Sequence, residues 1–551
     1  MHISYKPLVL LTSAAFVVIL AVLAILAHTL GPYEDETLFV STYFSSLASS
    51  YRLTLLGHDV PIMTMPYLGA LKTWIYAPLL SGLTPSLWLL RGPCILLALG
   101  SIYFYARAAS NLTGHRLDFF LMAGLLLCDS EYLLVNLFDW GPVAIHHFLF
   151  AICFWLFAGP ARFRERPTAR FLLLGVLTGL VIWNKANSVW IIAPLYSLVT
   201  LASLANTGLR LTCTRVALGA AGFFIGAFPL IASIAATGLA PIFGFVERDF
   251  NSFSTKFLHL RLALDHHSML NWFVNQQIFS GLPDMFLAGV TGIVLIIALF
   301  LASNQNRVYI GIAAVTLLTA WLQMATLRNA GGSMHHIVLL WPLHYFIIVA
   351  GIPKRPIGVG LVALLVFLNA YQSTAVYTAL HSGEPTPKWS LASKDLSDRL
   401  AELKPARLFV NDWGISNNLI FWSRGTLQGE SAAGVFWSVP LDDASKQTLQ
   451  KNMQDPSAVH VSLAKEHRYF GIVENAMNEV AGEQQVQKEI VETIKGESGL
   501  PLFEIYRFIP TSRETGSKMV DCETTAGRVV RSTKVASCFA SAQQSVPVDP
   551  P

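Results

Sequence analysis

The stretch that decides the fold runs from residue 8 to residue 39. It reads LVLLTSAAFVVILAVLAILAHTL (8–30) and continues directly into GPYEDETLF (31–39). The first part is long enough to cross a membrane, which takes about 20 mostly apolar residues. No A-x-A cleavage site follows it, so we expect an anchor and not a removable signal peptide. Three consecutive acids, Glu34, Asp35 and Glu36, therefore stand where the chain leaves the apolar core.

The composition extends this reading to the whole chain. Of 551 residues, 53% are hydrophobic and only 13% are charged, which is too little charge to cover the surface of a soluble domain of this size. The net charge of +4 gives no argument for nucleic-acid binding. The composition predicts an all-α polytopic membrane protein. Its expected spans are 8–30, 87–109, 117–135, 142–159, 170–184, 187–205, 216–237, 285–302, 308–327, 336–351 and 356–375.

One further apolar stretch, 66–83, contains Lys72 together with two prolines and two glycines. We expect it to lie at the membrane interface or to re-enter the membrane. Alternate loops are basic and almost free of acids, as in ARFRERPTAR (161–170) and PKRP (353–356). Because basic loops remain in the cytoplasm, this predicts a cytoplasmic N-terminus and places the three acids on the outer face.

The last third of the chain has ordinary soluble character. We expect a transmembrane catalytic domain over 1–375, a linker over 376–390, a soluble α/β domain outside the cytoplasm over 391–520 and a poorly ordered tail over 521–551. Cys522 and Cys538 are the only cysteines in this outer part, and the sequence leaves open whether they are bridged. Predicted strands are ARLFVND (406–412), RYFGIVE (468–474) and LFEIYRFI (502–509), and predicted helices are SLASKDLSDRLAEL (390–403) and QQVQKEIVETIKG (484–496).

Ionisable residues near the outer face are the candidates for chemistry, because charges at membrane depth are costly and usually functional. Lys72 is the most suggestive, since no adjacent loop explains it, although a snorkelling side chain is the alternative. Adjacent histidines such as His335 and His336 point apart on a helix, so they do not make a zinc site by themselves. A divalent metal remains possible through acids together with a histidine, with Glu36 and His146 as candidates. No nucleotide-binding glycine motif is present.

These residues resemble a known pattern. Asp35-Glu36 after the first span, the segment 61–83, Arg91 opening the next span and Asp139 in FDWGPVAIHH (138–147) are similar to the GT-C glycosyltransferases. The resemblance is greatest to family 39, with its bacterial protein O-mannosyltransferases and aminoarabinose transferases of lipid A. The stretch GGSMHHIVLLWPLHYF (331–346) resembles the late histidine-bearing loop of that branch. The likeness covers about 1–375, and the soluble domain lacks the β-trefoil-like repeat of eukaryotic O-mannosyltransferases.

The resemblance implies an inverting transfer of a sugar from a polyprenyl-phosphate carrier to a lipid, glycan or protein. Asp35 would be the base, and Asp139 would orient the acceptor or stabilise an oxocarbenium-like centre. Glu36 would hold a metal, a basic neighbour or the loop. If the acceptor is a phosphate, no base is required and Asp35 would orient it. The implied catalytic residues are Asp35, Glu36 and Asp139, and the implied ligands of the donor phosphate are Lys72, Arg91, Lys185, Arg328, His335 and His336.

Two other classes of protein remain open. A transporter or flippase for a lipid-linked glycan would explain an odd number of spans and the buried Lys72. Against it stand the absence of paired broken helices and the concentration of acids at one face. A non-catalytic scaffold of the cell envelope, with the soluble domain as its binding module, is the third reading. The expected location for all three is the bacterial inner membrane.

Overall fold

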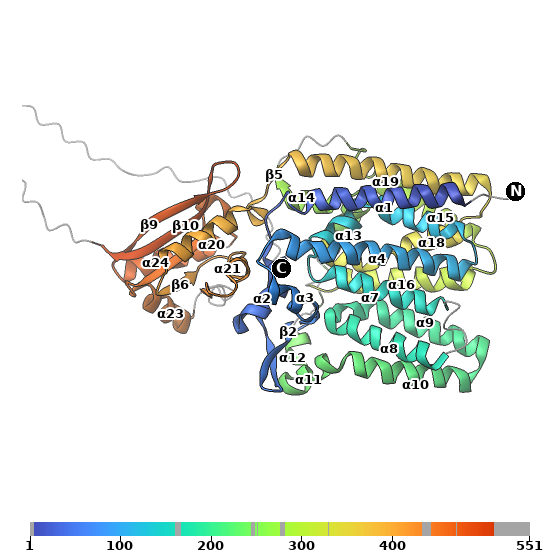
Figure 1. Cartoon of the computed structure of the whole chain (residues 1–551), viewed down its shortest axis with the longest axis horizontal. Coiled ribbons are helices and arrows are strands. Elements are labelled where there is room, and N and C mark those ends of the chain that lie inside the picture. The colour runs from blue at the N-terminus through green and yellow to red at the C-terminus, as the bar shows by residue number, and fades with distance from the viewer. Residues whose placement is uncertain are drawn as a thin grey trace, which may run out of the picture.

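The computed structural model describes residues 5–159, 167–243, 248, 250, 252–275, 281–328, 330–431, 442–469 and 471–511. A bundle of long helices lies beside a smaller domain of helices and strands, as Figure 1 shows. Within the described residues, eight helices are long and apolar enough to cross a membrane, or nine if one bent pair counts as a span. The chain is therefore a multi-pass membrane protein with an additional α/β domain, as predicted.

The predicted apolar segments all coincide with helices. Eleven spans were predicted, whereas eight or nine described helices are long enough, because helices such as Val143–Phe157 and Phe286–Leu301 are shorter. Three predicted segments also differ in detail. The segment 336–351 is a short helix, a helical turn and a second helix that begins at Leu343. The segment 117–135 is two helices that meet at an angle of 66°, because the side chain of Asp129 caps the second one by accepting from Tyr132 N. The segment 216–237 also contains two helices. The bundle helices are α1 (Lys6–Leu26), α4 (Leu87–Thr113), α5 (Leu117–Leu127), α6 (Ser130–Leu137), α7 (Val143–Phe157), α8 (Pro167–Asn184), α9 (Val189–Thr207), α10 (Leu209–Gly226), α11 (Phe228–Thr237), α15 (Phe286–Leu301), α16 (Arg307–Ala325), α17 (Met334–Ile337), α18 (Leu343–Gly351) and α19 (Pro356–Ser382).

Between α1 and α4 the chain folds at the end of the bundle that faces the smaller domain, as Figure 1 shows. The predicted interfacial stretch 66–83 becomes helix α3, and its Lys72 is fully buried. A snorkelling Lys72 is therefore excluded, since its side chain does not reach the surface. The elements at this end are α2 (Glu34–Phe44), β1 (Tyr51–Leu55), β2 (His58–Met65), β3 (Leu68–Gly69), α3 (Leu71–Gly82), α12 (Ala240–Phe243), α13 (Phe253–Leu264), α14 (Ser268–Phe273) and β4 (Val274–Asn275).

The link to the smaller domain is short. Helix α19 continues to Ser382, so the stretch predicted as a linker begins as helix. Strand β5 (Glu384–Pro385) then pairs with β4, and a short helical turn, η5 (Pro387–Trp389), follows. Because β5 is paired with β4, the turn that follows β5 is anchored to the bundle.

The smaller domain is built on a five-stranded sheet with the order β7-β6-β8-β10-β9. Strand β6 is parallel to β7 and β8, whereas β10 is antiparallel to β8 and β9. Its elements are α20 (Ala392–Leu403), β6 (Arg407–Val410), α21 (Ser416–Trp422), β7 (Glu430–Ser431), α23 (Asp443–Met453), β8 (Ala458–Leu463), α24 (Gly471–Glu483), β9 (Val486–Lys495) and β10 (Pro501–Pro510).

Two of the five predicted elements in this domain are wrong. The stretch 484–496 is strand β9 and not a helix, because its residues pair with β10 along its whole length. The stretch 468–474, predicted as a strand, contains the start of helix α24. Both segments are short and mix polar with apolar residues, so periodicity alone does not separate helix from strand. The predicted tail, with Cys522 and Cys538, lies outside the described residues.

Candidate active site at the bundle end

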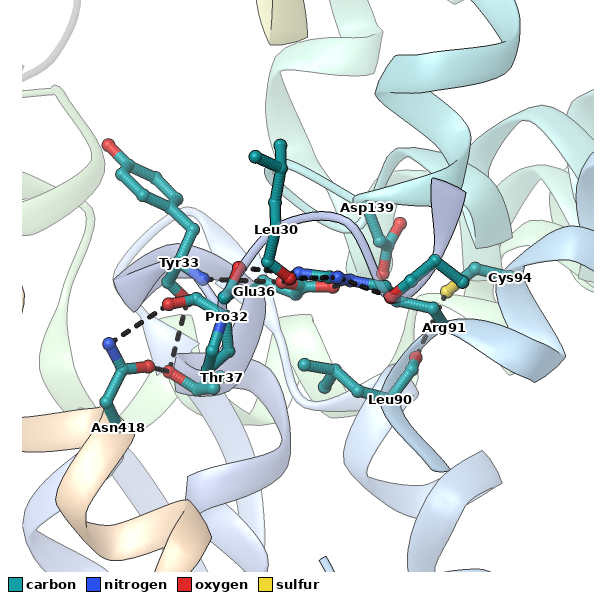
Figure 2. Close-up of polar contacts among 12 residues, drawn as sticks. Leu30, Pro32, Tyr33, Glu36, Thr37, Leu90, Arg91, Cys94, Asp139 and Asn418 are labelled. Atoms are coloured by element: carbon teal, nitrogen blue, oxygen red, sulfur yellow. Dashed lines mark hydrogen bonds and ion pairs between the residues drawn. The ribbon is translucent and has the colours of Figure 1, made fainter. Parts of the chain in front are cut away.

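The three adjacent acids at the start of α2 have three different environments. Glu36 is fully buried and forms a bidentate ion pair with Arg91, at 2.7 Å from Nε and 2.9 Å from Nη2. The remaining N–H groups of Arg91 donate to the carbonyls of Ala27, Leu30 and Gly31, each at 2.7 Å. Figure 2 shows the guanidinium lying alongside the Glu36 carboxylate.

This arrangement bears on two predicted roles. All five N–H donors of an arginine are used here within the protein. Arg91 therefore has no donor left for a lipid phosphate, and Glu36 has a cation of its own in place of a metal. The contacts give both residues a structural role, in which they fix the end of α1 against the start of α2.

Glu34 joins the bundle to the smaller domain. Its carboxylate accepts from the side-chain amide of Asn417 at 2.6 Å and from the backbone N–H of Asn417. Burial raises the pKa of Glu34 to about 7, while the bonds from Asn417 oppose that rise. The next residue, Asn418, bonds to Thr37 Oγ1 and to the carbonyl of Pro32, as Figure 2 shows. Helix α21 is thus held against the first turn of α2.

Asp35 is the acid that remains for chemistry. It is partly exposed, whereas both of its neighbours are buried. Among the described residues it makes one hydrogen bond, accepting from Trp140 Nε1 at 3.0 Å, and no ion pair. Burial raises the pKa of Asp35 to about 6, and Trp140, Lys185 and Lys388 oppose that rise. A carboxylate with a pKa near neutrality and a vacant oxygen is suited to accept a proton.

Lys72 and Asp139 form a second buried ion pair behind this acid, with 2.7 Å between Nζ and Oδ2. The other oxygen of Asp139 accepts from Ala144 N, in the first turn of α7. Asp139 has a φ of 44°, and Gly141 has a φ of 76°. The positive φ is unstrained for glycine but strained for Asp139, and strained backbone is often found at functional sites. The pair brings together two predicted site residues and fixes the turn that carries Trp140.

Lys185 and His335 lie on the bundle side of the same turn. The ammonium of Lys185 donates to the carbonyls of Gly141 at 2.8 Å and His335 at 3.0 Å. A Cβ at Gly141 would lie 2.8 Å from Lys185 Nζ and would displace the ammonium, and the φ of 76° at this position also favours glycine. His335 is partly exposed, bonds to Ser333 through Nδ1 and packs against the Trp140 ring at 4.6 Å between centroids. Its Nε2 has no partner within the described part of the chain.

The remaining predicted residues lie in other surroundings. Arg328 is exposed. His336 is buried and its ring lies edge-on to Trp190, and His146 is buried with Nδ1 bonded to Ser188. In the described ranges, no three His, Cys, Asp or Glu side chains are grouped so that they could hold a metal ion.

Aromatic residues around Asp35 were missed in the sequence. Trp140 stacks on Trp272 at 4.8 Å and 17°, and Tyr33 stacks on Trp389 at 4.7 Å and 13°. Lys388, in the turn after β5, lies beside this cluster. Trp140 directly follows Asp139, but its role depends on a contact with Asp35 across about a hundred residues of sequence, which no local pattern shows.

A helical membrane bundle, an acid-bearing turn after its first helix and a smaller α/β domain make up the architecture of the GT-C glycosyltransferases. The comparison with solved structures confirms this fold. ArnT from Cupriavidus metallidurans bound to undecaprenyl phosphate superposes with a TM-score of 0.55 at 14% identity, over 91% of this chain and 98% of that chain. The chain therefore has the GT-C fold.

Two weaker likenesses were also found. The apo state of the same ArnT has a TM-score of 0.46 at 15% identity, over 90% of this chain and 97% of that chain. The mycobacterial arabinofuranosyltransferase AftD has a TM-score of 0.44 at 14% identity, over 92% of this chain and 40% of that chain. No protein-family model and no curated protein sequence matches the chain.

Proposed function

We propose that this protein is an inverting glycosyltransferase that takes its sugar from a polyprenyl-phosphate carrier. It would act at the outer face of the inner membrane, with the N-terminus in the cytoplasm and the smaller domain on the outer side. The acceptor is a lipid, a glycan or a protein. The shared fold with ArnT, which was solved with undecaprenyl phosphate bound, supports the donor class.

One observation carries the proposal. Of three adjacent acids in one helix turn, Glu36 is neutralised by Arg91 and Glu34 is held by Asn417, while Asp35 keeps partial exposure and a vacant oxygen. A helix end that merely faced water would not bury and satisfy the two neighbours of one available carboxylate. The pattern is that of a positioned base on a rigid support.

The reaction follows from this placement. An acceptor hydroxyl attacks the anomeric carbon of the donor sugar while Asp35 accepts the hydroxyl proton. The bond from the anomeric carbon to the phosphate oxygen breaks as the new bond forms, and the carrier leaves as a polyprenyl phosphate. A single displacement of this kind inverts the anomeric configuration.

Negative charge develops on the departing phosphate and has to be stabilised. Lys185 is suited to this, because two of its three N–H donors bind carbonyls and one remains. The Nε2 of His335, whose ring packs against Trp140, is also available to the phosphate. The Lys72–Asp139 pair would then position the turn that carries Trp140, and Arg328 keeps its predicted role as a contact of the carrier phosphate.

The test is release of polyprenyl phosphate by the purified full-length protein in lipid nanodiscs, supplied with a panel of polyprenyl-phosphate sugars. Wild type should turn over one donor, and Asp35→Asn should lower the rate by about 10²- to 10⁴-fold, the usual contribution of a general base. Asp59→Asn is the matched control, since Asp59 is exposed and paired with Arg52 in the adjoining hairpin. Equal rates for wild type and Asp35→Asn, or no turnover of any donor, would overturn the proposal and favour transport or scaffolding.

A further inference from the structure

Two arginines of the bundle, one near the start of α8 and one in α10, lie against the same aromatic ring. The Cζ atoms of Arg170 and Arg215 are 5.3 Å and 5.5 Å from the ring centroid of Phe171. In Figure 1, α10 runs along the lower edge of the bundle and begins at the end away from the smaller domain. Helix α8 ends at Asn184, beside Lys185, so about 20 Å of helix separates Arg170 from the candidate active site. We call Arg170, Arg215 and the ring between them the arginine site.

The close packing of α8 on α10 holds the two arginines together. A Cβ on Gly175 would lie 2.0 Å from the carbonyl oxygen of Gly219, and a Cβ on Gly222 would meet the α8 backbone at 2.1 Å. Only glycine permits two helix backbones to approach so closely, and small residues at such contacts are typical of membrane helix pairs. Arg170 precedes Gly175 by five residues, and Arg215 precedes Gly219 by four. The two guanidiniums therefore extend from the same level of the helix pair.

The positive charges of this pair are not neutralised within the described part of the chain. None of the described carboxylates forms an ion pair with either arginine, and the charge that acts on Arg170 is that of Arg215. Two like charges held against one ring repel each other, and the partial burial of both side chains strengthens the repulsion. An anion bound beside the two guanidiniums removes this cost.

Both arginines keep hydrogen-bond donors for such an anion. Arg170 donates through Nε and Nη2 to the carbonyls of the last two residues of α7, which leaves its Nη1. Arg215 makes only long bonds, from Nη1 to Ser203 Oγ at 3.3 Å and to Thr207 Oγ1 at 3.4 Å. No described residue accepts from Nε or Nη2 of Arg215. The hydroxyl of Thr212 lies 3.1 Å from Ser203 Oγ, so hydroxyl groups accompany the guanidinium. Guanidinium and hydroxyl donors are suited to the oxygens of a phosphate.

We propose that the arginine site binds the phosphate of an anionic lipid from the membrane leaflet at this end of the bundle. The guanidiniums of Arg170 and Arg215 bind the phosphate oxygens, and the acyl chains lie along exposed apolar side chains of the neighbouring helices. The bound lipid neutralises the two charges and holds the starts of α8 and α10 together. This site is independent of the proposed transferase reaction, which involves Asp35 at the other end of the bundle.

The surroundings of the arginine site favour a lipid phosphate over a free phosphate ion. Exposed apolar side chains lie on the same part of α8, α9 and α10, and they are Leu173, Leu201, Leu209, Leu211 and Val216. A free phosphate would leave this apolar surface uncovered, whereas a lipid covers it and also neutralises the arginines. In the predicted orientation this end of the bundle faces the cytoplasm, where anionic phospholipids of the leaflet attract basic residues. A zwitterionic lipid carries a cation of its own, so a headgroup with a net negative charge fits the pair best.

Native mass spectrometry of the full-length protein in detergent can measure this binding. The protein is titrated with phosphatidylglycerol or with phosphatidylcholine of the same acyl chains, and inorganic phosphate is then added as a competitor. Wild type should bind phosphatidylglycerol at least about fivefold more tightly than phosphatidylcholine, which is the effect of one arginine near an anionic membrane surface. Arg215→Gln should remove this preference. Arg210→Gln is the matched control and should keep it, because Arg210 is an exposed arginine in the first turn of the same helix.

Several results would overturn the lipid site. They are equal affinity of wild type for the two lipids, no binding of either lipid, and an unchanged preference in Arg215→Gln. An equal loss of preference in Arg210→Gln would show a general effect of surface charge and would also overturn it. Displacement of phosphatidylglycerol by an equal concentration of inorganic phosphate would assign the arginines to free phosphate. If Arg215→Gln does not fold, Arg215→Lys keeps the charge but loses the paired donors of the guanidinium. It must then weaken phosphatidylglycerol and leave phosphatidylcholine unchanged, and wild-type affinity of Arg215→Lys for both lipids would refute the site.

Discussion

Two sets of charged side chains at the end of the bundle that faces the smaller domain have opposite surroundings. In the interior, Glu36 is paired with Arg91 and Lys72 with Asp139, and all four side chains are essentially buried. Asp35, in the first turn of α2, and Lys388, in the turn after β5, are only partly buried, and neither forms an ion pair among the described residues. Charge is costly at depth, so each interior pair stabilises the fold, and we propose that the Lys72–Asp139 pair also positions the turn that carries Trp140. The unpaired Asp35 is the group that we propose to act on a substrate.

The same contrast separates two ways of holding a carboxylate. Asp129, deep in the bundle, accepts from Trp341 Nε1, Tyr345 OH and the N–H of Tyr132. Such a fully bonded carboxylate has little capacity left for a substrate. Asp35 accepts from one indole and keeps an oxygen vacant. We therefore propose that hydrogen-bond saturation, more than burial, separates a structural acid such as Asp129 from a candidate base such as Asp35.

Breaking an interior pair should give the largest change in stability. Arg91→Met would leave Glu36 as an unpaired buried carboxylate and would remove the donors to Ala27, Leu30 and Gly31. Removing one partner of a buried pair costs about 3 to 5 kcal/mol. We expect a much lower midpoint of thermal unfolding in detergent, with little expression of folded protein.

Arg424→Met is the matched control, since Arg424 donates to the carbonyls of Leu80, Ser81 and Leu83 at the protein surface. It should change the midpoint far less. A stable and active Arg91→Met protein would contradict the interior side of the comparison, and would return Arg91 to the set of candidate phosphate ligands.

The pH dependence of donor turnover should report on Asp35. The base is active as the carboxylate, and burial raises its pKa to about 6. The rate should therefore be constant above that pH and fall about tenfold per pH unit below it. In the wild type, the Lys388 ammonium favours the charged form of Asp35 and lowers its pKa. Lys388→Met should therefore shift the fall in rate to higher pH. The measurement is kcat/KM for donor turnover between about pH 4.5 and 8.

Lys394→Met should leave the pH of this fall unchanged, since this lysine is exposed and lies on α20. A rate independent of pH across this range would show that Asp35 is not the base. That outcome would favour the alternative in which the acceptor is itself a phosphate and Asp35 orients it.

Much of the fold could be predicted from the sequence, because the helices of the bundle are long and apolar and are therefore recognisable in the sequence. The bend between α5 and α6 was not predicted, since an apolar run looks the same whether it is straight or broken by the cap at Asp129. In the smaller domain, strand β9 was predicted as a helix. Its identity depends on pairing with β10, which a local pattern does not contain.

The site was predictable in part, and for a physical reason. The sequence singled out Asp35, Asp139, Lys72 and Lys185, because acids and lysines are rare beside apolar segments. It left open whether Glu36 holds a metal, a basic neighbour or the loop, and only the fold shows the pairing with Arg91, which lies 55 residues away in the sequence. Lys388 was unremarkable in a proline-rich stretch, and only the fold places it over rings from two distant segments.

The smallest expected effect concerns the contact between α21 of the smaller domain and α2 at the end of the bundle. Asn417→Ala removes the 2.6 Å bond to Glu34 but leaves the backbone N–H of residue 417 as a donor to the same carboxylate. A hydrogen bond of this kind contributes about 1 kcal/mol. We expect faster hydrogen exchange in α21 and the first turn of α2, and an unchanged pH dependence of donor turnover. Asn478→Ala, on α24, serves as the control, because that helix is not part of the contact with α2. If Asn417→Ala abolished donor turnover instead, the contact between α21 and α2 would be required for the proposed chemistry at Asp35, and the contrast between structural contacts and the candidate base would fail.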